Sequence, residues 1–169
     1  MTFWEPLPAA APAPQRRRRY EEVEQHLRAI LEGEPDPVAA MATVACELHH
    51  AFDYFHWTGF YRRRGEQLVV GPYQGGHGCL RIDLSRGICG AAARTGRTQL
   101  VKDVSKRPEH IACSSSTRSE LVVPVRAPDG AVVAVLDIDS DEPAAFGPED
   151  AEAIERLCDW LGERYGEPW

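Results

Sequence analysis

Residues 119–140, SELVVPVRAPDGAVVAVLDIDS, hold the clearest structural signal in the chain. Two apolar runs, 121–126 and 131–138, flank Pro128-Asp129-Gly130, and this pattern predicts a β-hairpin. Side chains alternate along a strand, so Asp137 and Asp139 fall on one face of the second strand. Glu120 begins the first strand and can therefore lie near both of them.

These three carboxyl groups admit two interpretations. In the first, they are solvated side chains at the end of a strand. In the second, they line a pocket, because carboxylates are costly to bury without a cationic partner. Such a pocket would bind an ammonium group or hold a proton for donation.

Outward from the hairpin, the spacing of apolar residues predicts an α+β fold with a largely antiparallel sheet and helices on one of its faces. The segments expected to be helical are 20–31, 37–56, 89–95 and 148–165. The short strand-like runs are 58–62, 68–73, 80–84 and 98–101, and residues 105–119 are expected to form a long loop.

The length of 169 residues suits one domain. Residues 1–15 are rich in proline and alanine, which predicts a flexible tail before a single domain over residues 16–165. Four arginines at 16–19 are expected to form a solvated helix terminus, and a nucleic-acid or membrane role for them is the alternative.

Charge and hydropathy bear on the class of function. The net charge of -7 and the isoelectric point of about 5.4 disfavour a nucleic-acid partner. The chain has no run of about 18 apolar residues that would predict a membrane span, and its N-terminus does not resemble a secretory signal. Five cysteines are an odd number and too few for a disulfide scaffold, so we expect a cytoplasmic protein with redox or metal chemistry.

The five cysteines fall into two groups. Cys46 and Cys158 lie in predicted helices, where a small apolar filler is expected. Cys79 follows a glycine-rich segment, Cys89 lies where a short helix begins, and Cys113 lies in the long loop. A helix N-terminus favours the thiolate, which would make Cys89 reactive.

Zinc is an alternative role for the second group of cysteines. Four of the residues His77, Cys79, Cys89, His110 and Cys113 could supply a set of nitrogen and sulfur ligands. However, the cysteines lack the close pairing that marks structural zinc sites, so we expect no bound metal.

Several motifs, taken in order, resemble the GAF-domain family of free methionine-(R)-sulfoxide reductases. They are Trp57-Thr-Gly-Phe-Tyr61, Cys79-Leu-Arg-Ile82, Arg86-Gly-Ile-Cys-Gly90, His110-Ile-Ala-Cys113, Ser119-Glu-Leu-Val-Val-Pro124 and Val135-Leu-Asp-Ile-Asp-Ser140. The resemblance is dense over residues 57–140. It implies a GAF-like fold, with a loop-rich pocket on the sheet face opposite the terminal helices.

The resemblance also implies roles for particular residues. Cys113 matches the catalytic nucleophile, Cys79 matches its disulfide partner, and Cys89 matches a third, assisting cysteine. The side chains that match the substrate-binding set are the carboxyl groups of Glu120, Asp137 and Asp139 and the aromatic rings of Trp57 and Tyr61. The aromatic cluster Trp57, Phe60, Tyr61 and Tyr73 can equally be core packing; an aromatic wall would also suit the methyl group of a sulfoxide.

The implied reaction reduces free L-methionine-(R)-sulfoxide through a sulfenic acid and a disulfide. The implied reductant is thioredoxin, supplied by NADPH and thioredoxin reductase. No bound cofactor and no nucleic-acid or membrane partner are expected, and the resemblance suggests a homodimer. The alternative is a GAF module that binds a small ligand or senses redox state without catalysis.

Overall fold

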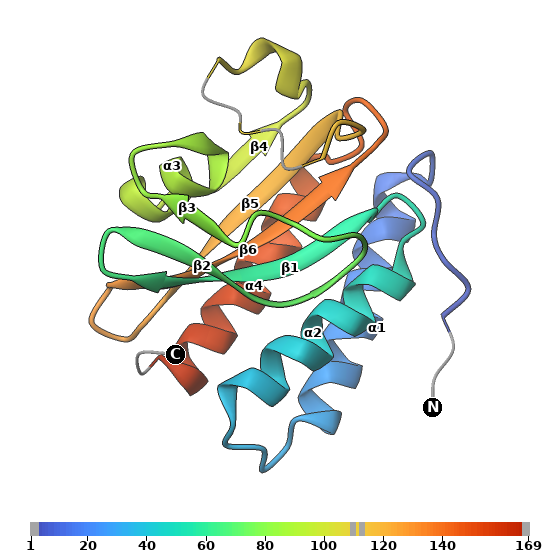
Figure 1. Cartoon of the computed structure of the whole chain (residues 1–169). Helices are drawn as coiled ribbons and strands as arrows, with labels where there is room; N and C mark the ends of the chain where they lie inside the picture. The colour runs from blue at the N-terminus through green and yellow to red at the C-terminus, as the bar shows by residue number, and fades with distance from the viewer. Residues whose placement is uncertain (1–3, 109–110, 112–113, 167–169) are drawn as a thin grey trace.

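A computed structural model describes residues 4–108, 111 and 114–166 of the chain. Its centre is a six-stranded sheet with the strand order β3-β2-β1-β6-β5-β4, in which every neighbouring pair is antiparallel (Figure 1). The strands are β1 (Trp57–Arg64), β2 (Gln67–Gln74), β3 (Arg81–Asp83), β4 (Gln99–Val101), β5 (Ser119–Arg126) and β6 (Val132–Ser140). The predicted α+β class and antiparallel sheet are confirmed.

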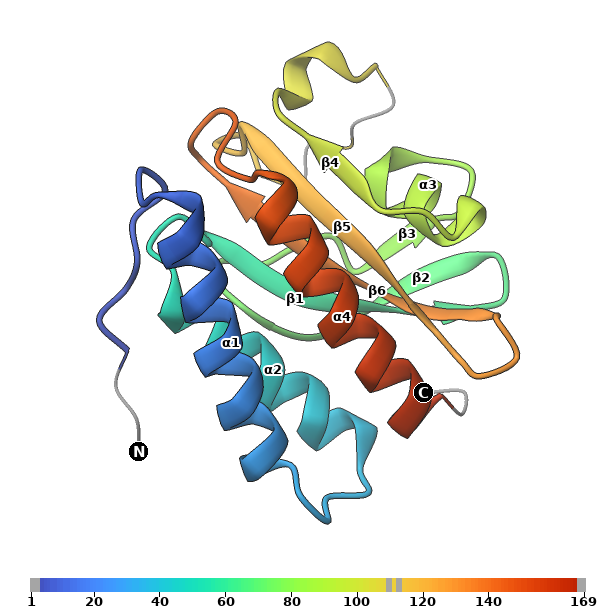
Figure 2. The same ribbon diagram turned by 180° about the vertical axis from the view of Figure 1, so that it is seen from behind.

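Three helices cover one face of this sheet, and a short helix lies on the other (Figure 2). The covering helices are α1 (Ala13–Ile30), α2 (Pro37–Ala51) and α4 (Pro148–Tyr165), and the short helix is α3 (Gly87–Thr95). The first face, with Phe60 and Leu136, joins the helical core, whereas Tyr61 and Val135 point into a second core beneath α3. This alternation is the period of a β-strand buried on both faces. It also separates Phe60 from the aromatic cluster expected to contain it.

The hairpin predicted from residues 119–140 forms as β5 and β6. Its register pairs Glu120 with Asp139 and Val122 with Asp137. Strand β6 pairs on its other side with β1, so the hairpin lies inside the sheet and its carboxyl-bearing end is flanked by β1 and β4.

The N-terminal segment differs from the expected flexible tail. Within residues 4–12, the Leu7 N–H donates to the Ala51 carbonyl at 2.9 Å, and the Asp53 N–H donates to the Leu7 carbonyl at 3.1 Å. The Trp4 indole donates to the Glu47 carboxylate at 2.7 Å. Apolar side chains between the prolines therefore pack on the end of α2, and proline, which lacks an N–H, leaves few backbone groups to satisfy.

The arginine run is also not simply solvated. Arg16 is largely buried and forms ion pairs with Asp150 at 2.6 Å and with Glu149 at 3.1 Å. The hydroxyls of Tyr20 and Tyr54 each donate to the same Asp150 carboxylate at 2.7 Å. This buried network fastens α1 to the start of α4. Within the described residues, no helix combines the length and the apolar character needed to cross a membrane.

Candidate functional site

The sheet register brings the predicted carboxyl groups together. Asp139 pairs with Trp57 on one side and with Glu120 on the other, and Asp137 pairs with Gly59. Asp137, Asp139 and Glu120 therefore occupy neighbouring positions on one face, the face that carries Tyr61 and α3 rather than the three covering helices. The predicted proximity of the three carboxyl groups is confirmed.

Two of these carboxyl groups are withdrawn from water. Glu120 and Asp137 are each only 5% exposed, and the Asp137 Oδ1 atom has no hydrogen-bond partner among the described residues. Burial, and next the charge of Glu120, raise the pKa of Asp137 well above its usual value. Burial and the neighbouring Asp137 raise the pKa of Asp139 in the same direction. The cluster therefore favours bound protons, which the interpretation as solvated strand-end residues does not explain.

The thiol of Cys89, in the first turn of α3, completes this cluster. It is 4% exposed, and the ligand atoms of Cys89, Glu120 and Asp137 all lie within 4.8 Å of one another. Burial, followed by the charges of Asp137 and Glu120, raises the pKa of Cys89 well above its usual value. The expectation that the helix N-terminus favours the thiolate of Cys89 is therefore wrong, because burial and the neighbouring carboxyl groups of Asp137 and Glu120 outweigh the helix dipole.

An aromatic wall stands beside the carboxyl groups. The rings of Trp57 and Tyr61 stack with centroids 5.7 Å apart, and the ring of Tyr73 also stacks on Trp57, with centroids 5.3 Å apart. The Trp57 indole donates to the Gly76 carbonyl at 2.9 Å. A Cβ on Gly78 would lie 3.0 Å from the Tyr61 hydroxyl and 3.1 Å from Trp57, so a larger residue would require these side chains to shift by a few tenths of an ångström.

Cys79 follows this glycine-rich segment and is disulfide-bonded and partly exposed. Cys113 and His110, which the sequence also placed in the site, lie outside the described residues. Cys46 and Cys158 are free thiols on α2 and α4, and Cys158 is fully buried in the helical core, as its predicted filler role requires.

A small cavity of about 20 Å³ adjoins the thiol and carboxyl cluster. Its lining comprises Ile82, Gly87, Ile88, Cys89, Ile111 and Glu120. Ile111 covers the start of α3, where a Cβ on Gly87 would lie 3.0 Å from its side chain. A space of this size holds about one water molecule. This cavity is therefore too small for an amino acid.

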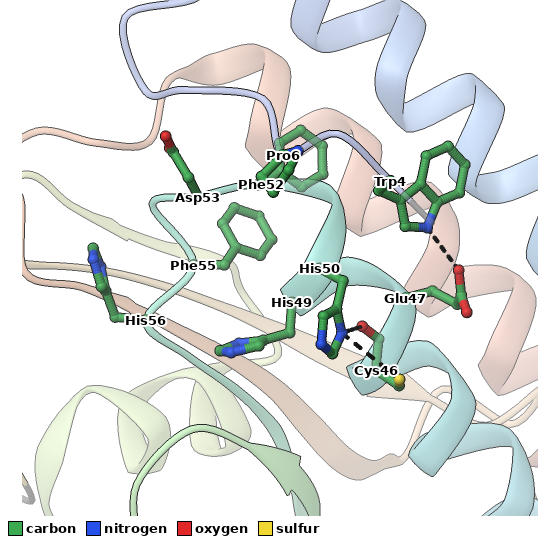
Figure 3. Close-up of a pocket in the computed structure, with 10 residues that line it drawn as sticks. All are labelled: Trp4, Pro6, Cys46, Glu47, His49, His50, Phe52, Asp53, Phe55 and His56. Carbon is green, nitrogen blue, oxygen red and sulfur yellow. Dashed lines mark hydrogen bonds between the residues drawn. The ribbon is translucent and has the colours of Figure 1, made fainter. Parts of the chain in front are cut away.

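A larger cleft, of about 480 Å³, lies at the end of α2 (Figure 3). It contains none of the predicted site residues; its floor is Phe52 and Phe55, and its rim includes His49, His50 and His56. Burial, and next the charges of the other two histidines, lower the pKa of His49. Among the described residues, the only three potential metal ligands within 4.8 Å of one another are Cys89, Glu120 and Asp137, so the histidines of this cleft do not converge on one point.

Comparison with known proteins agrees with this fold. A family model described as GAF domain matches residues 36–162, from the start of α2 to near the end of α4. The fold is therefore that of a GAF domain.

Similar proteins narrow the class. An X-ray structure of free methionine-R-sulfoxide reductase from Neisseria meningitidis, in complex with its substrate, matches with a TM-score of 0.87 and 38% identity, covering 98% of this chain and 96% of that one. Free methionine-R-sulfoxide reductase of Saccharomyces cerevisiae is 36% identical over 136 residues, 76% of each chain. A protein of Zymomonas mobilis is 40% identical over 147 residues, 87% of this chain and 91% of its own. The chain belongs to the GAF-domain family of free methionine-(R)-sulfoxide reductases.

Two residues of the site were not found from the sequence. Ile111 closes the cavity, and Gly78 allows the backbone to approach the aromatic wall. The glycine-rich segment before Cys79 is the sequence signal for Gly78. No local pattern indicates that Ile111 meets α3, because that contact joins two segments distant in sequence.

Proposed function

We propose that this protein reduces free L-methionine-(R)-sulfoxide to methionine. The observation that carries the proposal is the cluster of three carboxyl groups, with Glu120 and Asp137 buried and Asp139 partly exposed, beside the aromatic pair Trp57 and Tyr61 on the same face of the sheet. A free amino acid sulfoxide offers an ammonium group for anions, an S=O oxygen for a proton donor and a methyl group for an aromatic wall. The names of the Saccharomyces and Neisseria relatives support the same substrate.

The carboxyl groups have two tasks in this proposal. A sulfoxide is a poor electrophile until its oxygen is protonated, so one carboxyl group must carry a proton at neutral pH. The raised pKa values of Asp137 and Asp139 suit that donor role. Glu120 and the remaining anion would hold the substrate ammonium.

The thiols supply the two electrons. The Cys113 thiolate attacks the sulfur of the protonated sulfoxide and forms an S–S bond. The substrate S–O bond and this S–S bond then break as the hydroxyl passes to the Cys113 sulfur, so methionine leaves with the electron pair and Cys113 becomes a sulfenic acid. The Cys79 thiol then condenses with the sulfenic acid, which releases water and forms a disulfide. In balance, one sulfoxide and two thiols give one thioether, one disulfide and one water. Cys79 being disulfide-bonded and partly exposed supports its role as the resolving partner.

Cys89 has an assisting role in this scheme. Its buried thiol holds its proton, so it is a weak nucleophile in this conformation. It lies against Asp137 and Glu120, where it can tune their protonation. We therefore assign it to the acid cluster rather than to the first attack on sulfur.

The remaining parts of the proposal concern the cellular setting. We propose that a thioredoxin-type dithiol reduces the disulfide by exchange, with NADPH and thioredoxin reductase as the electron source. We further propose that the protein works in the cytoplasm as a homodimer, without a bound cofactor. The resemblance to the family and the thiol chemistry support these proposals.

NADPH consumption with thioredoxin, its reductase and separated sulfoxide enantiomers tests the proposal. We expect turnover of the free (R) form, and none of the (S) form or of peptide-bound methionine sulfoxide. Equal turnover of both enantiomers, or none, would contradict the proposed function. Tight binding of the (R) form without NADPH consumption would indicate a sensing module instead.

A further inference from the structure

We propose that Cys89, Glu120 and Asp137 form a binding site for a thiophilic divalent cation such as Zn²⁺, which inhibits the protein by occupying its acid cluster. The inhibitory consequence rests on the proposed function, whereas the binding of the cation does not.

The geometry of the three side chains supports a metal site. They come from α3, β5 and β6, they are buried, and one potential ligand atom from each lies within 4.8 Å of the other two. Zinc bonds of about 2.0–2.3 Å in a tetrahedral site place the ligand atoms roughly 3.5 Å apart. Small rotations of these side chains would therefore bring all three atoms to bonding distance. Spacing along the sequence does not reveal this set, because the structural zinc pattern concerns cysteines close in sequence.

Two further observations point to a ligand at this place. The Asp137 Oδ1 atom is buried and lacks a hydrogen-bond partner among the described residues, so it retains an unused acceptor. The adjoining cavity of about 20 Å³, lined by both Cys89 and Glu120, has room for about one water molecule. Three protein ligands and one open position for water form the usual arrangement of an exchangeable zinc site.

The donor atoms select the kind of cation. Mg²⁺ and Ca²⁺ prefer ligand sets made entirely of oxygen, whereas a thiolate combined with carboxylates suits zinc and its thiophilic analogues. Zinc binds the thiolate and carboxylate forms of such ligands, so binding of the cation should release protons. The bound cation would also remove the acid needed by the sulfoxide oxygen and the anions needed by the substrate ammonium.

Cobalt titration of the full chain tests the site directly, because a thiolate–Co²⁺ bond gives a near-ultraviolet charge-transfer absorption. The disulfide form is used, because Cys79 then has no free thiol to bind cobalt. Every protein tested carries Cys46→Ser, because the Cys46 Sγ atom lies 3.8 Å from the His50 Nδ1 atom on α2 and this pair could itself bind cobalt. We expect one Co²⁺ per chain, no charge-transfer absorption in Cys89→Ser, and an unchanged titration in Cys158→Ser. The same absorption in Cys89→Ser, or none in the parent, would overturn the site.

The carboxylate ligands require a separate measurement. Asp137→Asn and Glu120→Gln should each weaken Zn²⁺ binding at least tenfold in calorimetry, with far-ultraviolet circular dichroism confirming that each variant is folded. Unchanged affinity in both variants would overturn the proposed ligand set. Because two conservative variants are compared, misfolding of one still leaves the other to decide.

Enzyme assays separate this proposal from the proposed function. We expect Zn²⁺ to inhibit sulfoxide turnover competitively, with full recovery after a chelator is added. If Zn²⁺ binds at Cys89 but leaves the rate of sulfoxide turnover unchanged, the inhibitory role is overturned. Metal binding in a protein that reduces no sulfoxide would overturn the proposed function and leave the metal site intact.

Discussion

Burial of the Asp137 carboxyl group lowers the stability of the domain, and the substitution Asp137→Asn measures by how much. The residue is 5% exposed, and its Oδ1 atom has no hydrogen-bond partner among the described residues. A buried polar group left unsatisfied costs about 1–3 kcal/mol. Asparagine keeps the shape, cannot ionise and can donate to the neighbouring Glu120 carboxyl. We therefore expect Asp137→Asn to raise the free energy of unfolding by about 2 kcal/mol, which corresponds to a Tm increase of about 4–8 °C for a domain of this size.

The gain should depend on pH. The pKa of Asp137 is raised in the folded state, so between its unfolded value of about 4 and its folded value the native protein holds a proton that the unfolded chain has lost. The free energy of unfolding therefore falls as pH rises through this interval. The stability that Asp137 contributes as a protonated group is present at low pH and is lost above the folded pKa. The advantage of asparagine should thus be small near pH 4 and larger at pH 8.

Thermal and urea unfolding at pH 5 and pH 8 measure this difference, with Asp53→Asn as a matched substitution at an exposed position. The same Asp137→Asn protein should lose about 100-fold in kcat/KM for the (R)-sulfoxide, the usual effect of losing a general acid. If Asp137→Asn is no more stable than the control at pH 8, or if its gain does not grow between pH 5 and pH 8, the carboxyl group is not a destabilised buried acid. The proton-donor role would then fail with it.

Three other substitutions test separate parts of the molecule. Cys113→Ser should abolish turnover while Cys158→Ser keeps it; a near-normal rate in Cys113→Ser would refute the assigned nucleophile. Gly78→Ala should raise KM about tenfold, roughly 1.4 kcal/mol, because its Cβ would press on the Tyr61 hydroxyl and on Trp57; an unchanged KM would show that this wall does not bind substrate. Asp150→Asn should lower the free energy of unfolding by about 1–3 kcal/mol, because Arg16 then keeps only Glu149 as an ionic partner and the hydroxyls of Tyr20 and Tyr54 lose their charged acceptor. An unchanged free energy in urea unfolding would contradict this role.

The parts of the fold that the sequence predicts are those with local causes. The β5–β6 hairpin follows from a turn signal between two apolar runs, and the alternation of side chains places Asp137 and Asp139 on one face without any knowledge of the rest of the chain. Glu120 joins them because hairpin strands are adjacent by construction. Cys158 lies in the core because its helix has an apolar stripe at that position.

The parts that the sequence does not predict depend on distant contacts. Arg16 and Asp150 are 134 residues apart, and four consecutive arginines resemble a solvated terminus until α4 places a buried carboxylate beside the first of them. Cys89 has the local setting of a reactive thiol, but its packing against β5 and β6 reverses the sign of its pKa shift. Trp4 and Leu7 occupy a proline-rich segment and pack only because the end of α2 is near.

The two faces of the sheet divide stability and chemistry between them. Large apolar side chains of α1, α2 and α4 cover one face. On the same face, the Asp150 carboxylate accepts hydrogen bonds from Arg16, Tyr20, Tyr54 and the Gly147 N–H. The opposite face carries carboxyl groups and a thiol that burial disfavours in their charged forms, with an unsatisfied oxygen among them. Because folding is cooperative, the free energy gained on the first face can offset the cost on the second.

A weakened Asp150 network should therefore narrow the pH range over which the domain stays folded, and Asp137→Asn should restore part of that range in the same chain. Since the two carboxyl groups lie in different cores, their effects on the free energy of unfolding should add to within about 0.5 kcal/mol; a larger coupling would mean that the two faces share more than the sheet between them.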